Sequence, residues 1–170
     1  SRCVNDASGS RHILNLCNGN VCRPSVNISM NKCYGQLIYC YPLSDSNSVT
    51  CPFLYSSFTD NFAIYCTCIW LRMSGAKYEI KSCNIIRNTQ GNLDTEGTIV
   101  TYGNSMIEDS CILDNKATYV FYQQSSSYTI TLSNCTVDST SSNGYLTIKK
   151  HIYKKLHSRI EPHVYSKLPI

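Results

Sequence analysis

A pattern that recurs about every 27 residues constrains this chain more than any other feature of its sequence. Its clearest copies are "SSFTDN", "SCNIIRN" and "SCILDN", and "VNISMN" and "NCTVDS" fit more loosely. The last position of each copy is Asn31, Asn61, Asn88, Asn115 or Ser139. A Gly or Ala and then alternating apolar residues follow, beginning at positions 35, 63, 97, 117 and 144. Repeats of this length indicate a solenoid, in which each unit buries its apolar face against the next.

The segments within each repeat have the pattern of short strands. "KYEIKSC" before Cys83 and "YTITLSNC" before Cys135 alternate between apolar and polar residues, which is typical of strands and not of helices. We therefore predict an all-β fold, a right-handed parallel β-helix (solenoid) of about five coils over residues 26–148. The alternative is a β-sandwich, whose strands also recur at short intervals, but a sandwich does not explain why whole units look alike.

Stacked coils would place equivalent residues of the repeat in ladders about 4.8 Å apart. We predict an inward core ladder because Cys packs as a small hydrophobe, with Ser57 in the same place one coil earlier. Its members are Cys83, Cys111 and Cys135. Ile107 is one residue out of step with this register, which predicts a bulge or slip near it.

A second ladder is predicted at a turn. Asn tolerates the left-handed backbone conformation and can hydrogen-bond to an equivalent Asn in the next coil. The members of this turn ladder are Asn31, Asn61, Asn88 and Asn115.

The two ends of the chain differ from the repeat. Residues 1–25 are predicted to be a Cys-rich N-terminal cap or a degenerate coil, because the open end of a β-helix must be covered. Residues 149–170 hold six Lys or Arg against one acid, and Ile152, Leu156 and Ile160 recur at helical spacing. This basic tail is predicted to be a capping helix or a frayed end. The alternative is a basic patch for acidic glycans, membrane or nucleic acid.

The cysteine content favours an oxidising compartment. The chain has 11 cysteines in 170 residues, and the odd number leaves at least one thiol unpaired or intermolecular. Glycosylation sequons at Asn27 and Asn134 fit a secreted protein. We therefore expect an extracellular or cell-surface location, and no transmembrane segment, since no apolar run approaches about 18 residues.

A column of charged residues precedes the Asn positions and is the candidate ligand or calcium face. Its members are Asp60, Arg87, Asp114 and Asp138. β-Helix enzymes that cleave polysaccharides place carboxylates on such a face, as acid and base or to hold calcium. The alternative is that Asp is a preferred turn residue and that Arg87 bridges its neighbours. Asp94 and Glu96 lie in the longest insertion, which is the candidate contact loop because solenoid insertions gather on the binding face.

The sequence supports no defined catalytic or cofactor site. It has no G-x-S-x-G nucleophile elbow, no phosphate-binding glycine loop and no paired C-x2-C zinc knuckles. The four histidines are expected to lie on the surface. We therefore expect no catalytic residue, metal ion or cofactor, and no nucleic-acid partner.

The "S-C-x-x-x-N" and "G/A-x-I-x-x-Y" elements of residues 26–148 resemble two groups of β-helix proteins. They are similar to the repeats of the polymorphic outer membrane protein type and closer still to cysteine-bearing β-helix surface proteins of parasitic protists. The resemblance implies surface display and adhesion to a host surface, with a glycan or protein ligand, and no defined reaction. The chain departs from these groups in its small number of coils and in its basic end.

These observations predict an extracellular or cell-surface β-helix module that acts in adhesion or structural display. The alternative is a fragment of a β-helix polysaccharide lyase or glycoside hydrolase, which the charged column favours.

Overall fold

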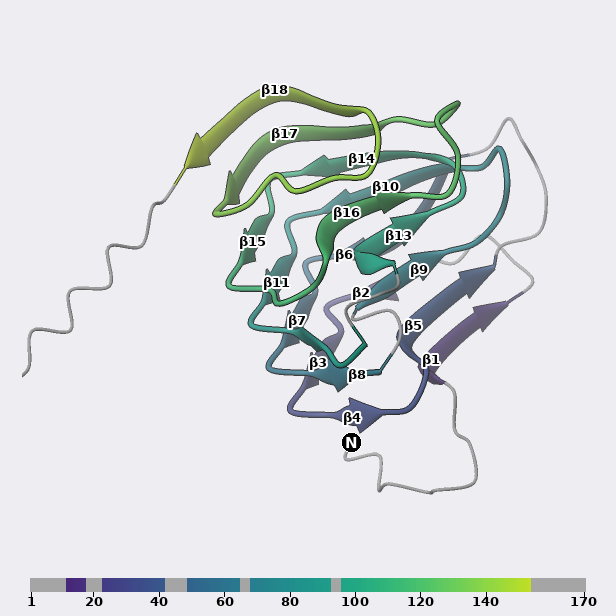
Figure 1. Cartoon of the computed structure of the whole chain (residues 1–170), viewed down its shortest axis with the longest axis vertical. Coiled ribbons are helices and arrows are strands. Elements are labelled where there is room, and N and C mark those ends of the chain that lie inside the picture. The colour runs from purple at the N-terminus through teal and green to yellow at the C-terminus, as the bar shows by residue number, and fades with distance from the viewer. Residues whose placement is uncertain (1–11, 18–22, 42–48, 65–67, 93–95, 154–170) are drawn as a thin grey trace, which may run out of the picture.

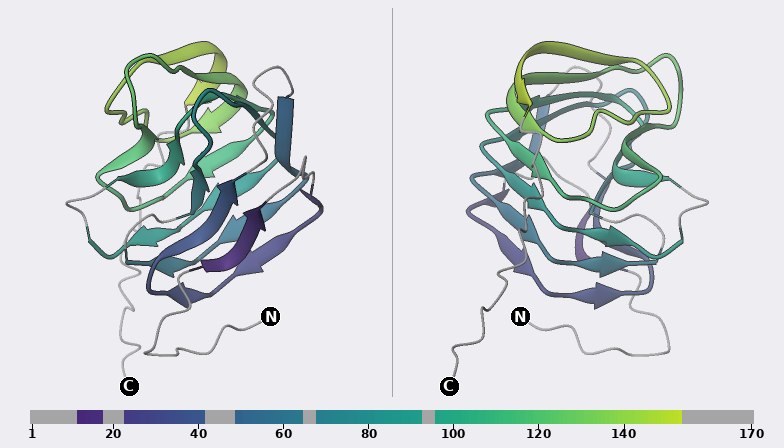
Figure 2. Two further views of the ribbon diagram at one scale, coloured as in Figure 1. Left: turned by 90° about the vertical axis from the view of Figure 1, so that its right-hand side faces the viewer. Right: turned by 60° about the vertical axis from the view of Figure 1, so that its left-hand side comes forward.

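The computed structural model describes residues 12–17, 23–41, 49–64, 68–92 and 96–153 of the chain. These residues form an all-β structure without helix, a parallel β-solenoid of about four turns (Figure 1). The coils stack from the N-terminal end, coloured purple, to the C-terminal end, coloured yellow, and Figure 2 shows the stack from two other sides. The prediction of a parallel β-helix is confirmed.

Three sheets run along the solenoid, and their described strands pair in parallel. The first sheet contains, in spatial order, β1 (His12–Cys17), β5 (Gln36–Tyr41), β9 (Ile69–Leu71), β13 (Gly97–Thr101) and β16 (Tyr119–Gln123). The third sheet is small and contains β12 (Thr89–Gln90), β8 (Phe62–Ala63) and β4 (Lys32–Cys33).

The second sheet has two arms that are joined by one long strand. One arm contains β2 (Arg23–Pro24), β6 (Val49–Leu54), β10 (Lys77–Lys81) and β14 (Asn104–Glu108). The other contains β3 (Asn27–Ser29), β7 (Ser57–Thr59), β11 (Asn84–Ile86) and β15 (Cys111–Leu113). The long strand β17 (Ile130–Val137) pairs with both β14 and β15, and β18 (Leu146–Tyr153) pairs with β17.

The core consists of columns of apolar residues that the parallel register brings together. One column comes from the first sheet and two come from the arms of the second, and every member is at most 9% exposed. These columns are Ile38, Ile69, Ile99 and Phe121; Phe53, Ile80, Ile107 and Leu132; and Ile28, Phe58, Ile85, Ile112 and Val137. Each fully buried side chain of this kind contributes about 1.5–3 kcal/mol, so the stacking of coils is the main source of stability.

Single residues with a left-handed backbone form two corners of the coil. At the corner between the arms of the second sheet they are Ser25, Tyr55, Ser82, Asp109 and Asn134, and at the corner that leads to the third sheet they are Met30, Asp60, Arg87 and Asp114. Their φ angles lie between 50° and 58° although none is glycine, which costs about 1–2 kcal/mol each. At the second corner, the backbone N–H groups of Met30, Asp60 and Arg87 each donate to a carbonyl of the next coil. These hydrogen bonds offset the cost of the left-handed conformation.

The turn ladder of asparagines lies directly after the second of these corners. Asn31, Asn61 and Asn88 each donate both the backbone N–H and Nδ2 to Oδ1 of the Asn one coil further on, at 2.9 to 3.2 Å. Asn115 ends the series. The asparagines do not themselves adopt the left-handed conformation, which belongs to the residue before each of them. Their role is to hydrogen-bond between coils in the interior.

The predicted core ladder of cysteines is wrong at Cys111. Cys83 and Cys135 are each 1% exposed, but Cys111 is part-exposed and pairs with Asn84 and Thr136. Ser110 occupies the inward position instead: its Oγ accepts from the Cys83 backbone N–H at 3.1 Å and donates to the Glu108 carbonyl at 2.7 Å.

The inward column at the first corner therefore alternates between hydroxyl and thiol groups, with Ser56, Cys83, Ser110 and Cys135 as its members. Ser56 Oγ and the thiols of Cys83 and Cys135 each donate to the carbonyl two residues earlier, as Ser110 does. Ile107 is in register with Ile80 and Leu132, so the slip predicted near Ile107 is also wrong. The residue out of step is Cys111.

The coil count is about four because the last repeat does not complete a turn. The segment of residues 139–144, "STSSNG", forms no strand. It pairs with the first sheet through one isolated bridge, between Ser142 and Phe121. Ser, Asn and Gly favour turns over strands. The "GYLTIK" segment then enters β18 and pairs with β17 in the second sheet, so it is not equivalent to the first-sheet strands of the earlier repeats.

The ends of the described structure belong to the sheets. Within the predicted N-terminal region 1–25, β1 pairs in register with β5, while residues 1–11 and 18–22 lie outside the described residues. Ile152 lies in β18, so the helix predicted to include it is wrong at that position, and residues 154–170 of the basic tail are not described. None of the described residues forms a helix with the length and apolar character that a membrane crossing requires.

Candidate functional site

The outer face of the first sheet carries a row of large side chains. Tyr39 is in register with Trp70, Trp70 with Val100, and Val100 with Tyr122. Each directly follows an inward residue of the core column, so strand alternation directs it outward, about 4.8 Å from its neighbour in the row. Val100 has no exposed surface although it lies outside the core cluster. Side chains of the outer face therefore cover it.

A groove of about 610 Å³ lies at the N-terminal part of this row, and we call it the aromatic groove. Its lining residues are His12, Tyr34, Gly35, Gln36, Tyr39, Trp70 and Arg72. The His12 ring stacks on Tyr39 with centroids 4.7 Å apart, and Trp70 meets Tyr39 edge to face at 5.7 Å. A volume of this size lies within the usual range of ligand sites, and the lining combines aromatic rings with polar side chains.

Arg72 lies over two rings of the aromatic groove. Its guanidinium carbon is 5.8 Å from the centroid of Tyr39 and 5.4 Å from that of Trp70, and Nη1 donates to the Tyr39 hydroxyl at 3.2 Å. The backbone N–H of Arg72 donates to the Cys40 carbonyl at 2.9 Å, which fixes the root of the side chain. Contacts of an exposed cation with aromatic faces stabilise it by about 0.5–1 kcal/mol, so they favour this position of the guanidinium before any ligand arrives.

Glu96 is the member of the predicted contact loop that the structure relates to this groove. Burial raises the pKa of its carboxyl group, and the positive charge of Arg72 acts in the opposite direction. Burial also raises the pKa of Tyr102, and the charge of Glu96 adds to this effect. Asp94 lies outside the described residues.

Two other cations of the described surface, Lys81 and Arg87, already have carboxylate partners. Lys81 lies 3.1 Å from both Glu79 and Glu108 on the second sheet, and hydrogen bonds to these two carboxylates raise the pKa of its amine. Arg87 pairs with Asp60. Arg72, by contrast, forms no ion pair with any described residue, and its contacts are with aromatic rings and a phenol hydroxyl.

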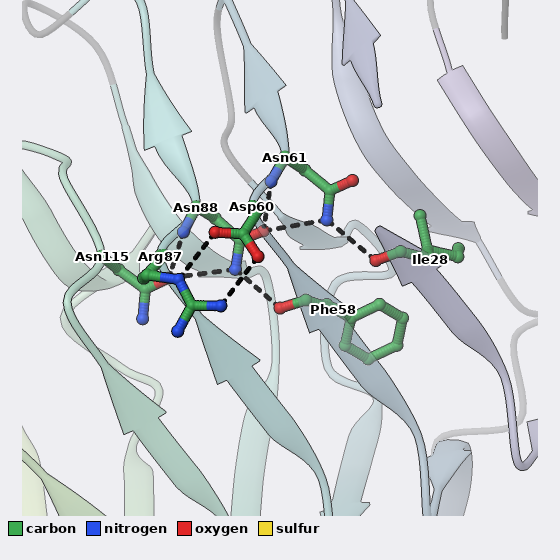
Figure 3. Close-up of polar contacts among 7 residues, drawn as sticks. All are labelled: Ile28, Phe58, Asp60, Asn61, Arg87, Asn88 and Asn115. Carbon is green, nitrogen blue, oxygen red and sulfur yellow. Dashed lines mark hydrogen bonds and ion pairs between the residues drawn. The ribbon is translucent and has the colours of Figure 1, made fainter. Parts of the chain in front are cut away.

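The charged column at the second corner is occupied by contacts within the protein. Arg87 binds Asp60 through two hydrogen bonds, Nε to Oδ1 at 2.7 Å and Nη2 to Oδ2 at 2.8 Å, beside the turn ladder (Figure 3). Asp138 Oδ2 accepts from the backbone N–H of Asp114 at 2.6 Å. Arg87 therefore bridges two neighbouring coils. Asp138 supplies the acceptor for the backbone N–H of the corner residue Asp114. Among the residues described, no three His, Cys, Asp or Glu side chains are grouped so that they could hold a metal ion.

Both sequon asparagines have exposed positions. Asn27 is an exposed residue of β3, and Asn134 is an exposed corner residue whose Nδ2 donates to Asp109 Oδ1 at 2.6 Å. Neither belongs to the lining of the aromatic groove.

The aromatic groove was not predicted from the sequence, although a signal for it is present. In the first-sheet strands β5, β9, β13 and β16, the residue after the inward apolar residue is Tyr in "IYC", Trp in "IWL", Val in "IVT" and Tyr in "FYQ". Only the correct register of the first sheet aligns these four segments, because the loops before them differ in length.

No protein-family model, curated protein or solved structure matches this chain.

Proposed function

We propose that this chain is a non-catalytic binding module of an extracellular or cell-surface protein, and that the aromatic groove binds a carbohydrate chain on a partner surface. The observation that carries the proposal is the groove itself, in which Tyr39, Trp70 and Arg72 meet on the outer face of a parallel sheet.

Carbohydrate suits this lining for a chemical reason. Aromatic rings have a negative face, which attracts the polarised C–H bonds on the faces of a sugar ring. The polar side chains of Gln36, Arg72 and His12 lie in the same lining and can hydrogen-bond to hydroxyl groups around the sugar. Arg72 and Tyr34 are exposed, so the groove is open to a segment of a longer glycan.

Adhesion is the role that fits the rest of the molecule best. The repeat motifs resemble those of β-helix surface proteins, and the solenoid is a rigid stack that presents one side of its first sheet to solvent. The abundance of cysteine and the exposed sequons at Asn27 and Asn134 support a location outside the cell.

The test is a binding screen of the whole chain against neutral and acidic oligosaccharides, followed by calorimetric titration of the best ligand. Loss of one stacking ring costs on the order of 0.5–1.5 kcal/mol, so Tyr39→Ala should weaken binding by a few-fold to about tenfold. Tyr55→Ala is the matched control, because Tyr55 is 64% exposed at the first corner and does not line the groove. Equal effects of the two substitutions, or no binding to any oligosaccharide, would contradict the proposal.

A further inference from the structure

Arg72 differs from Lys81 and Arg87 in having aromatic partners and no ion pair with a described residue. A guanidinium has five N–H donors in a planar fork, and in Arg72 one nitrogen, Nη1, donates to a described residue, Tyr39. Arg87, also exposed, uses two nitrogens on Asp60. No described residue takes the remaining donors of Arg72 at the edge of the groove, and a carboxylate or sulfate would match them in both charge and shape.

The rings beneath Arg72 orient the guanidinium. Its carbon atom lies over both Tyr39 and Trp70, and the hydrogen bond to the Tyr39 hydroxyl restricts it further. A ligand that stacks on the same rings would bring an attached anionic group beside the guanidinium with little further ordering of the side chain.

Glu96 is the charged group that opposes such a ligand. Its carboxylate lies within electrostatic range of Arg72 but forms no ion pair with it among the described contacts. It lowers the positive potential at the groove without occupying the donors of Arg72. Removal of its charge should therefore strengthen the attraction of an anionic ligand and leave a neutral one unaffected.

From these contacts we infer that the aromatic groove selects glycans that carry an anionic group, a carboxylate or a sulfate, through Arg72. This inference rests on the proposed function, that the groove binds carbohydrate.

The experiment compares matched pairs of probes by calorimetric titration of the whole chain at low salt. Tetragalacturonate and its methyl ester test a carboxylate, and sulfated and unsulfated cellotetraose test a sulfate. The acidic member of at least one pair should bind about tenfold more tightly, the usual effect of one charge-assisted hydrogen-bonded pair. The preference should shrink as salt is raised, because the groove is exposed.

Three substitutions separate the outcomes. Arg72→Gln should abolish the preference for the acidic probe, Glu96→Gln should enlarge it, and Arg87→Gln, which removes an exposed arginine elsewhere, should leave it unchanged. If Arg72→Gln does not fold, Glu96→Gln still tests the inference, because an unchanged preference for the acidic probe in that variant would contradict it. Equal affinity for both members of each pair would overturn the inference while the proposed function stands. Absence of binding by all four probes would contradict the proposed function as well.

Discussion

Asn61 donates two hydrogen bonds to one oxygen of Asn88, although 27 residues separate them: its backbone N–H lies 3.2 Å and its Nδ2 lies 2.9 Å from Asn88 Oδ1 (Figure 3). Asn88 is fully buried and in turn donates to Asn115 Oδ1 and, from Nδ2, to the Phe58 carbonyl. The Asn88 side chain therefore hydrogen-bonds both to the coil before it and to the coil after it.

Asn88→Ala should lower the free energy of unfolding by about 3 kcal/mol or more, because it removes the acceptor of two hydrogen bonds from Asn61 and the donor of a third to the Phe58 carbonyl, all in the interior. Urea denaturation measures this change. Asn31→Ala is the control at the end of the ladder: its side chain donates to Ser29 and Asn61, and no described group donates to its Oδ1. Equal losses at the two positions would show that the ladder does not couple the coils.

The three cysteines of the predicted core ladder should differ in reactivity. Cys83 and Cys135 are 1% exposed and burial raises the pKa of both thiols, so they should be alkylated slowly until the protein unfolds. Cys111 is part-exposed and should react first. Peptide mapping after brief alkylation of the native protein measures the order. Modification of Cys135 before Cys111 would refute the observed register of β15 and β17.

The Asp60–Arg87 pair should make a small pH-dependent contribution to stability. The hydrogen bond from Arg87 lowers the pKa of Asp60 below its ordinary value of 3.8. A lowered pKa in the folded state means that the contribution is fully present above the unfolded pKa and is lost as pH falls through the folded pKa. Arg87→Gln should therefore destabilise the protein at neutral pH, and this effect should disappear as the pH falls through the lowered pKa of Asp60.

An NMR titration of the Asp60 carboxyl group tests the same relationship directly. The pKa of Asp60 should rise in Arg87→Gln. It should stay lowered in the control Lys116→Gln, which removes a positive charge one coil beyond Arg87. An unchanged pKa in Arg87→Gln would mean that the ion pair does not form in solution.

The sequence predicts the solenoid and the turn ladder because both depend on spacing alone. Asn61, Asn88 and Asn115 are separated by a constant 27 residues, and a stack of coils with that period must bring them together. The cysteine ladder failed for a related reason. Cys83 stands five residues before Asn88, whereas Cys111 stands four before Asn115, so a register counted from the asparagines places Ser110 inside.

The candidate site could not be predicted in the same way. The distance from each turn asparagine to the first-sheet core residue varies, from Asn31 to Ile38 and from Asn88 to Ile99 for example, because loops of different length intervene. Tyr39 and Trp70 therefore align only once hydrogen-bonded register is known. The charged column was visible in the sequence, but its side chains bind one another and the backbone.

Trp70 is the single tryptophan of the chain and lines the aromatic groove, so its fluorescence reports on the site directly. The decisive measurement is acrylamide quenching of this fluorescence with and without a saturating oligosaccharide from the binding screen. If glycan stacks in the groove, the bound sugar should shield the indole, the quenching constant should fall, and Tyr39→Ala should require more sugar for the same protection. An oligosaccharide that binds the chain and leaves both the emission and the quenching of Trp70 unchanged would contradict the account.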